Sequence, residues 1–383
     1  MAQVSLNAHL RAGVALAVAT MTVDEACAAA SATVYGIVDT SVVYTRNSGS
    51  AHDMIEPQSG SLSGSRIGIK GVEPLGGGAA AMFQVENGFN AVNGRMNQGR
   101  RLFGRQSHVG WRSPDGHAII AGRLYDPLTD LVQPLQGDGF LGQTFSTPGD
   151  VDNADASVRF NHAIKWSSPG MGGFRAAGMI SLGGVAGAAG SGLSHGAALS
   201  YRRGPFSAGA GYLRVDFGNP TRARRGESSA DSLFNSAINA AYESAASAQI
   251  VRVAVQYALG AITAGTYYSD SRYRPDGASQ FARPQVYRNA SVYGVWQVTS
   301  ALTAELAYNH LRASGDSSAR YQQLSGGTSY LLSKRTDVYA TAGYAHASGS
   351  NGLGAATAVV GATAVDAGGP TQWRLNAGLR HRF

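Results

Sequence analysis

Cysteine is nearly absent from this chain of 383 residues. The single cysteine, Cys27, lies within residues 1–30, where the apolar run "AGVALAVATMTV" follows Arg11 and precedes the small-residue tract "ACAAASA". This order of segments is typical of a secretory signal peptide. We therefore expect residues 1–30 to be cleaved and residues 31–383 to form the exported protein. That protein would contain no disulfide, so its stability must come from another source.

Long hydrophobic runs are absent as well. The apolar run of the leader has only twelve residues, whereas a membrane-spanning helix needs about 20. Charged residues make up only 14% of the chain, and no Pro/Ser-rich linker divides it. The composition argues against a helical membrane protein and gives no sign of several soluble domains.

Glycine, by contrast, is abundant. The chain contains 51 glycines, about double the usual share, and they lie in short runs in which apolar and polar residues alternate. In the final segment, "QWRLNAGLRHRF", Trp373, Leu375 and Phe383 share one parity and the arginines share the other. An extended strand would place these two sets on opposite faces.

Sixteen strand-like segments of this kind can be counted along the chain, each close to the ~9–11 residues of a tilted transmembrane strand. Tight joints such as "RGP" and "SKR" alternate with long connections such as residues 217–247 and 348–370. Short turns at one end and long loops at the other are typical of an up-and-down outer-membrane barrel. A soluble sandwich also alternates, but it would rarely place Arg or Lys on the polar face of so many central strands. We therefore predict an all-β fold, a sixteen-stranded antiparallel transmembrane barrel.

Seven stretches, spread in order over residues 33–383, carry a family resemblance. They are "TVYGIVDTSVVY", "SRIGIKGVEPLGGG", "FQVENGFN", "LFGRQSHVGW", "AGRLYDP", "LLSKRTDVYA" and "GLRHRF". In these stretches the chain resembles the general diffusion porins of the Gram-negative outer membrane, particularly the trimeric porins of beta-proteobacteria. The resemblance implies a homotrimer in the outer membrane, surrounded by lipid and lipopolysaccharide. It also implies that each barrel has its own water-filled channel, narrowed by a third extracellular loop that folds inward.

An acidic segment marks the position of that loop. Between Leu124 and Val158 the chain has six aspartates and no lysine or arginine, although its net charge is +7. A surface loop could be acidic merely because it is solvated, but we expect this one to fold into the lumen and face basic residues there. The predicted acidic constriction residues are Asp126, Asp130, Asp138, Asp150, Asp152 and Asp155.

Four arginines are expected to face this loop. Alternation places Arg66 and Arg159 on the lumen side. Arg105 and Arg123 are assigned from the constriction positions that the resemblance implies, because strand parity is unreliable at both. The predicted constriction residues are Arg66, Arg105, Arg123 and Arg159, with Lys70 and Lys165 as further pore-lining residues. Fixed guanidinium charges replace part of an anion's lost hydration, so we expect a preference for anions.

Other functions leave weaker signals. The nine histidines are scattered along the chain, and no Ser/His/Asp cluster indicates a catalytic site. The sequence predicts no metal and no cofactor. The basic segments "GRMNQGRR" and "RRGPF" are interpreted as loop or turn charges, not as a nucleic-acid site. The predicted function is passive diffusion of ions and small hydrophilic solutes. The alternatives are a substrate-selective channel for phosphate or a dicarboxylate, and an outer-membrane barrel enzyme.

Overall fold

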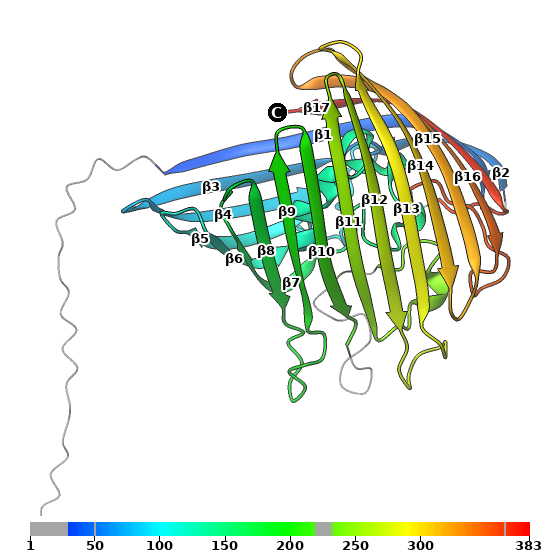
Figure 1. Cartoon of the computed structure of the whole chain (residues 1–383), viewed down its shortest axis with the longest axis horizontal. Helices are drawn as coiled ribbons and strands as arrows, with labels where there is room; N and C mark the ends of the chain where they lie inside the picture. The colour runs from blue at the N-terminus through cyan, green and yellow to red at the C-terminus, as the bar shows by residue number, and fades with distance from the viewer. Residues whose placement is uncertain (1–29, 50, 219–230, 232, 364) are drawn as a thin grey trace, which may run out of the picture.

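The computed structural model describes residues 30–49, 51–218, 231, 233–363 and 365–383. Within these residues, seventeen strand segments form one antiparallel sheet. Strand β1 pairs with β17, and β9 pairs with β10, so the sheet closes on itself as a barrel (Figure 1). Residues 1–29 of the predicted signal peptide lie outside the described part of the chain.

The strands are β1 (Ser31–Ser48), β2 (Ala51–Ser59), β3 (Arg66–Gly76), β4 (Ala79–Gly88), β5 (Gln106–Arg112), β6 (Ala118–Leu124), β7 (Phe160–Ser167), β8 (Phe174–Ser181), β9 (Ser194–Arg203), β10 (Phe206–Asp216), β11 (Ser247–Leu259), β12 (Ile262–Arg274), β13 (Gln285–Gln297), β14 (Leu302–Ser314), β15 (Ala319–Leu331), β16 (Thr336–Gly349) and β17 (Thr371–Arg382). Two short α-helices, α1 (Pro127–Leu131) and α2 (Asp138–Leu141), lie between β6 and β7. Single 3₁₀ turns occur at Gln133–Leu135, Gln143–Phe145, Pro148–Asp150 and Ala240–Tyr242. No helix in the described ranges is long and apolar enough to cross a membrane.

The seventeen segments occupy sixteen positions around the barrel. Strand β1 pairs with β2 along its residues 40–48 and with β3 along its residues 31–37. Strands β2 and β3 are therefore the two halves of one barrel strand, interrupted at residues 60–65. The sixteen-stranded barrel predicted from the sequence is confirmed.

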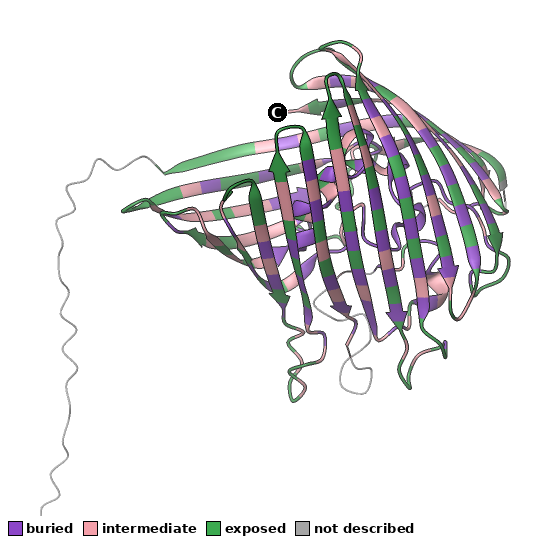
Figure 2. Ribbon diagram, viewed as in Figure 1, coloured by how far each residue is buried: buried purple, intermediate pink, exposed green. Residues whose placement is uncertain are grey.

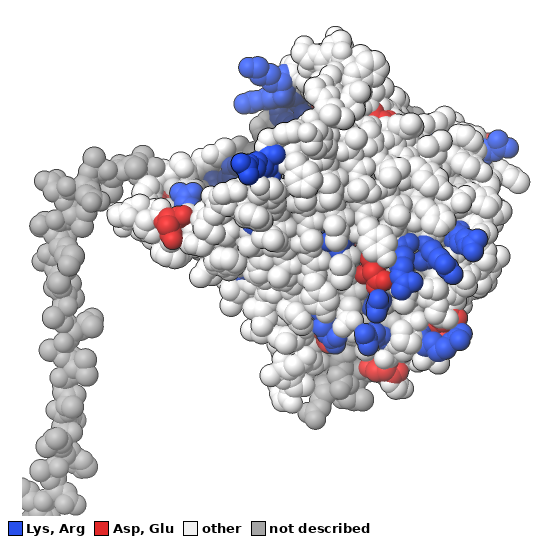
Figure 3. Space-filling view, in the orientation of Figure 1, with Lys and Arg blue, Asp and Glu red and all other residues white. Residues whose placement is uncertain are grey.

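Alternation along the strands divides the barrel wall into two faces. In β17, Trp373 and Leu375 are each 46% exposed on the outside, whereas Arg374 is completely buried. Figure 2 shows the same alternation of buried and exposed bands along β11 to β16, and the middle of the outer wall in Figure 3 carries few charges. The period of two read from the sequence thus separates an apolar outer surface from a polar lumen.

Strand β7 departs from the alternation read from its sequence. Ile164 and Trp166 are exposed on the outer face, but Phe160, which shares their parity, and Val158, which precedes the strand, are completely buried. His162, between these pairs, has a positive φ of 48°. The pairing of β7 with β6 is irregular at this point, so Phe160 no longer follows the parity of Ile164. Val158 and Arg159 precede the strand, so alternation does not decide the direction of either side chain.

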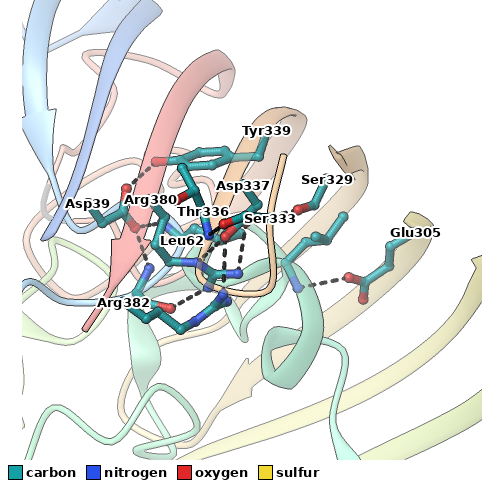
Figure 4. A network of polar contacts seen from close by, with 12 residues as sticks. Asp39, Leu62, Glu305, Ser329, Ser333, Thr336, Asp337, Tyr339, Arg380 and Arg382 are labelled. Atoms are coloured by element: carbon teal, nitrogen blue, oxygen red, sulfur yellow. Dashed lines mark hydrogen bonds and ion pairs between the residues drawn. The ribbon is translucent and has the colours of Figure 1, made fainter. Parts of the chain in front are cut away.

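The interruption at residues 60–65 is clasped by a buried carboxylate. Asp39 of β1 accepts hydrogen bonds from the backbone N–H groups of Leu62 (2.9 Å) and Ser63 (2.6 Å) and from the Tyr339 hydroxyl (2.5 Å). Figure 4 shows this clasp beside a second network in which Arg380 of β17 binds Asp337 of β16. The clasp turns residues 60–65 toward the inside of the barrel, where Leu62 packs against residues of the α2 region.

The segment between β6 and β7 lies inside the barrel. Its helix α1 packs on β10, where Gly209 and Gly211 leave the necessary space. A Cβ at Gly209 would come within 2.9 Å of the Leu131 carbonyl oxygen, and one at Gly211 within 2.8 Å of the Leu128 side chain. Residues from the other long connections, including Ile238, Tyr242 and Val360, belong to the same buried cluster. The lumen is therefore narrowed by this inward-folded loop and partly covered from the long-loop end.

Candidate functional site

The inward-folded loop, residues 60–65 and the barrel wall enclose a cavity of about 470 Å³. Three of the predicted arginines line it, Arg66, Arg105 and Arg159. From the loop, two of the predicted aspartates, Asp138 and Asp155, line it as well. The structure thus brings five of the predicted residues together around one space.

Tyr125, at the start of the loop, organises two of these arginines. The Arg159 guanidinium lies 4.8 Å from the centre of the Tyr125 ring, and Nη2 donates a hydrogen bond to the tyrosine hydroxyl (2.9 Å). Arg159 Nη1 donates to the Ser157 carbonyl oxygen (2.7 Å). The Arg105 guanidinium lies 5.8 Å from the centre of the same ring. Stacking on an aromatic ring suits guanidinium groups and holds their planes in place.

Arg105 is further held by an ion pair. Its Nε donates to Glu86 Oε1 at 2.7 Å, and Glu86 Oε2 accepts a hydrogen bond from the Tyr35 hydroxyl at 2.8 Å. Arg105 stands one residue before β5, so strand parity does not decide where its side chain points. Because the pair is largely buried, Arg105 is fixed in position and part of its charge is balanced by Glu86.

Arg66 is the least constrained of the three. Its Nε donates to the Gly64 carbonyl oxygen (2.8 Å), and its side chain remains partly exposed to the cavity. Its terminal nitrogens form no hydrogen bond or ion pair with other residues in the described ranges. Arg66 therefore presents the most available positive charge in the cavity.

Arg123, Lys165 and Lys70 do not line the cavity. Gly122, in the left-handed region with φ of 144°, interrupts the pairing of β6 with β7. The Arg123 side chain forms an ion pair with Asp231 (2.5 Å) and donates to the Gly104 carbonyl oxygen (2.8 Å). The buried Lys165 is ion-paired with Asp130 of the loop, whereas Lys70 is exposed. Arg123 and Lys165 thus fasten loop segments to the wall.

Two of the six predicted aspartates hold the loop in shape. Asp126 caps α1 by accepting a hydrogen bond from the Leu128 N–H (2.8 Å), an arrangement that satisfies a free donor of the first turn. Asp152 accepts from the hydroxyls of Tyr267 (2.6 Å) and Thr147 (3.0 Å). Both carboxylates are completely buried, so their role is to fold the loop and tie it to β12.

Three further loop carboxylates, Asp138, Asp150 and Asp155, form an acidic group at the cavity. Burial, together with the nearby Asp150 and Asp152, raises the pKa of Asp138 to about 7, against the opposing influence of Gln133 and Arg252. Burial and mutual repulsion also raise the pKa values of Asp150 and Asp155, and the cavity arginines oppose the rise at Asp155. At neutral pH these carboxylates are therefore only partly ionised, while the arginines keep their full charge.

Several residues that the sequence analysis did not select also shape the site. Arg252 of β11 is completely buried, and its Nη1 donates to the Asn153 carbonyl oxygen of the loop (2.5 Å). Glu305 of β14 accepts a hydrogen bond from the Leu141 N–H of α2 (3.1 Å). In each strand the residue stands at one of the alternate positions that face the lumen. This alternation is the sequence signal that could have identified both residues. Tyr125 lies in no strand and offered no such signal.

One pentapeptide matches a known catalytic sequence pattern. Residues 192–196 read "GLSHG", which matches the G-x-S-x-G pattern of a nucleophile on a strand-to-helix turn. In the structure Ser194 instead begins β9, and its hydroxyl accepts a hydrogen bond from the Asp216 N–H (3.0 Å). The motif therefore lacks the backbone setting that its chemistry requires. In the described part of the chain, no group of three or more His, Cys, Asp or Glu residues is arranged to hold a metal ion.

Comparison with known proteins agrees with this architecture. A family model described as Gram-negative porin matches residues 12–350. An outer membrane porin protein of Bordetella pertussis is 33% identical over 161 residues, which cover 38% of this chain and 41% of the relative. Outer membrane porin protein 32 of Delftia acidovorans is 31% identical over 157 residues, which cover 39% of this chain and 44% of the relative. The chain thus matches less than half the length of these two curated relatives.

Solved structures match over nearly the whole chain. The anion-selective porin from Comamonas acidovorans has a TM-score of 0.71 and 21% identity, covering 93% of this chain and 100% of that one. The trimer form of OmpT from Vibrio cholerae has a TM-score of 0.65 and 14% identity, covering 93% and 100%. At these identities the structural matches establish the shared fold.

Proposed function

Since the chain belongs to the Gram-negative porin family, we propose that it forms a water-filled outer-membrane channel for passive diffusion of ions and small hydrophilic solutes, with a preference for anions. One observation carries the preference. Arg66, Arg105 and Arg159 line the narrowed part of the lumen. The two carboxylates there, Asp138 and Asp155, are only partly ionised because burial raises their pKa values. The net charge at this point is positive at neutral pH. The name of the Comamonas relative, an anion-selective porin, supports the same direction.

The proposed mechanism requires no chemical step. An anion that enters the constriction loses part of its hydration shell, and the guanidinium groups replace some of the lost interactions. Arg66 offers free donors, while Arg105 and Arg159 are held in place by Glu86 and Tyr125. Several moderate sites in a row allow an ion to leave again, because no single one binds it too strongly.

The proposal is tested by reconstitution of the purified protein in a planar bilayer. We expect stepwise ohmic conductance and, in a salt gradient, a reversal potential that indicates excess anion permeability. Absence of conductance steps would favour the barrel-enzyme alternative. Block of chloride conductance by micromolar phosphate or dicarboxylate would favour a substrate-selective channel, since a general pore should show only weak competition at millimolar concentrations.

We also propose that the protein assembles as a homotrimer. Val34 and Val42 on β1 are each 59% exposed in the single chain, so this face must contact lipid or a neighbouring subunit. The trimeric relative from Vibrio cholerae favours subunit contact. An unheated detergent extract should migrate on a gel as a trimer and convert to a monomer on boiling. Migration as a monomer in both lanes would argue against the trimer.

The anion preference should decrease as the pH rises. The pKa of about 7 at Asp138 lies above the ~3.9 of an unfolded aspartate, so the folded state binds more protons between these values. Binding of this proton therefore stabilises the folded state. This contribution to the free energy of unfolding is fully present below about pH 4 and is lost as the pH rises through about 7. Above that value the ionised carboxylate also offsets the cavity arginines. Reversal potentials at pH 5 and pH 9 should therefore show the stronger anion preference at pH 5, and Asp138→Asn should reduce the difference. An anion preference that grows with pH would contradict the assignment.

A further inference from the structure

A row of arginines lies on the outer wall of the barrel, away from the lumen. Arg272, Arg288, Arg312 and Arg320 share the parity of exposed apolar residues on β12, β13, β14 and β15 and are exposed themselves. Arg288 is directly opposite Arg312, and Arg312 is directly opposite Arg320. With Arg274 at the end of β12, these residues cross four adjacent strands near the long loops, and Figure 3 shows basic side chains gathered over this part of the wall.

Few carboxylates lie close enough to balance the positive charge of this row. Asp270 accepts hydrogen bonds from Arg272 (2.6 Å) and Arg288 (2.9 Å), whereas Glu305, the other carboxylate on these strands, faces the lumen. Arg312 and Arg320 form no ion pair or side-chain hydrogen bond with the residues that the structure describes. Five arginines thus face one carboxylate. Like charges directly opposite each other destabilise a pair of strands, so an anionic partner would stabilise this surface.

The surface beside the row is apolar. On the same outer face and toward the short turns lie Val292 (57% exposed), Leu306 (60%) and Leu324 (51%). They stand four to six residues from the arginine of their own strand, or roughly 13–20 Å at the rise of an extended strand. A partner that fits both parts therefore carries an anionic headgroup at the level of the long loops and hydrocarbon at the level of these residues.

We propose that this arginine row binds the phosphate groups of a phosphorylated lipid in the outer leaflet, with the acyl chains lying against the apolar residues beside it. The planar guanidinium group suits phosphate because it donates two parallel hydrogen bonds. The inference rests on the outer-membrane location in the proposed function, but it concerns a surface that takes no part in conduction.

The test uses the purified full-length protein in detergent with lipid A as the probe, and native mass spectrometry to count bound lipid. In the test variant, Arg288, Arg312 and Arg320 are each replaced by glutamine. Lipid A affinity should fall about a hundredfold, because each arginine near an anionic membrane surface contributes a factor of about five. The control variant replaces three exposed basic residues at the short turns, Arg203, Lys334 and Arg335, by glutamine. This control should bind lipid A as the unchanged protein does.

The outcomes separate the possible occupants of the row. A loss of tenfold or more in the test variant alone supports the proposal, and a smaller loss or an equal loss in the control overturns it. Competition by inorganic phosphate at the same concentration as lipid A would assign a free-anion site and also overturn it. Loss of the trimer with unchanged lipid A binding would assign the row to a subunit contact instead. Conductance of the test variant should be unchanged, so failure of this inference is distinct from failure of the channel proposal.

Discussion

Replacing Arg66 by glutamate is expected to abolish or reverse the anion preference of the channel. Arg66 lines the cavity and has the fewest partners of the three arginines there. Two unit charges ~8 Å apart interact by about 2 kcal/mol at an effective dielectric constant near 20, before salt screening reduces the value. Replacing the positive charge by a negative one changes the interaction energy of an ion at the constriction by twice this amount. We therefore expect the ratio of anion to cation permeability, measured from reversal potentials, to fall by about tenfold or more.

Arg66 is a sharper position for this test than Arg105. Arg105 is ion-paired with the buried Glu86, so a glutamate there would place two carboxylates together and destabilise the barrel as well. The matched control is Arg203→Glu, which makes the same charge change at an exposed residue beside a short turn. If both variants shift the reversal potential equally, selectivity comes from diffuse net charge and not from this cavity.

Replacing Arg252 by leucine is expected to release the inward-folded loop. Arg252 is completely buried, donates to the Asn153 carbonyl oxygen and interacts electrostatically with Asp126, Asp152 and Asp138. Removing one partner of a buried charge group costs about 3–5 kcal/mol, because the remaining charges stay uncompensated. Single-channel recordings should therefore show fluctuating conductance and a weaker anion preference.

The control for this variant is Arg374→Leu. Arg374 is also a completely buried arginine, but its side chain bonds Thr45 and Gln58, which lie on β1 and β2 and not in the loop. Its removal should lower the stability of the barrel while the open-channel current remains steady. Steady current and unchanged selectivity in Arg252→Leu would show that other contacts suffice to hold the loop.

The barrel wall could be predicted from the sequence because its rule is local. Successive side chains of a strand point to opposite faces, so the alternation of Trp373, Arg374 and Leu375 was enough to place each of them. Where the backbone leaves the regular pleat, as at His162, the same rule failed for Phe160. The departure depends on a single positive φ value, which no alternation pattern reveals.

The location of the acidic loop could also be predicted, but the roles of its residues could not. Six aspartates without a basic neighbour indicated a distinct segment. Only Asp138 and Asp155 line the cavity, while Asp126 caps a helix and Asp152 binds Tyr267, more than a hundred residues away in the sequence. In the same way, Arg123 meets Asp231 across 108 residues.

The strand number, the two faces of the wall and the acidic segment between Leu124 and Val158 could be predicted from the order of the amino acids. These properties follow from the period of two and from composition, which act within a few residues of the chain. The three-dimensional fold selects the three arginines that share a cavity and the two aspartates that hold the loop in shape, and it places Arg252 against the loop. Those choices depend on contacts between distant segments, and such contacts exist only once the barrel has closed around the loop.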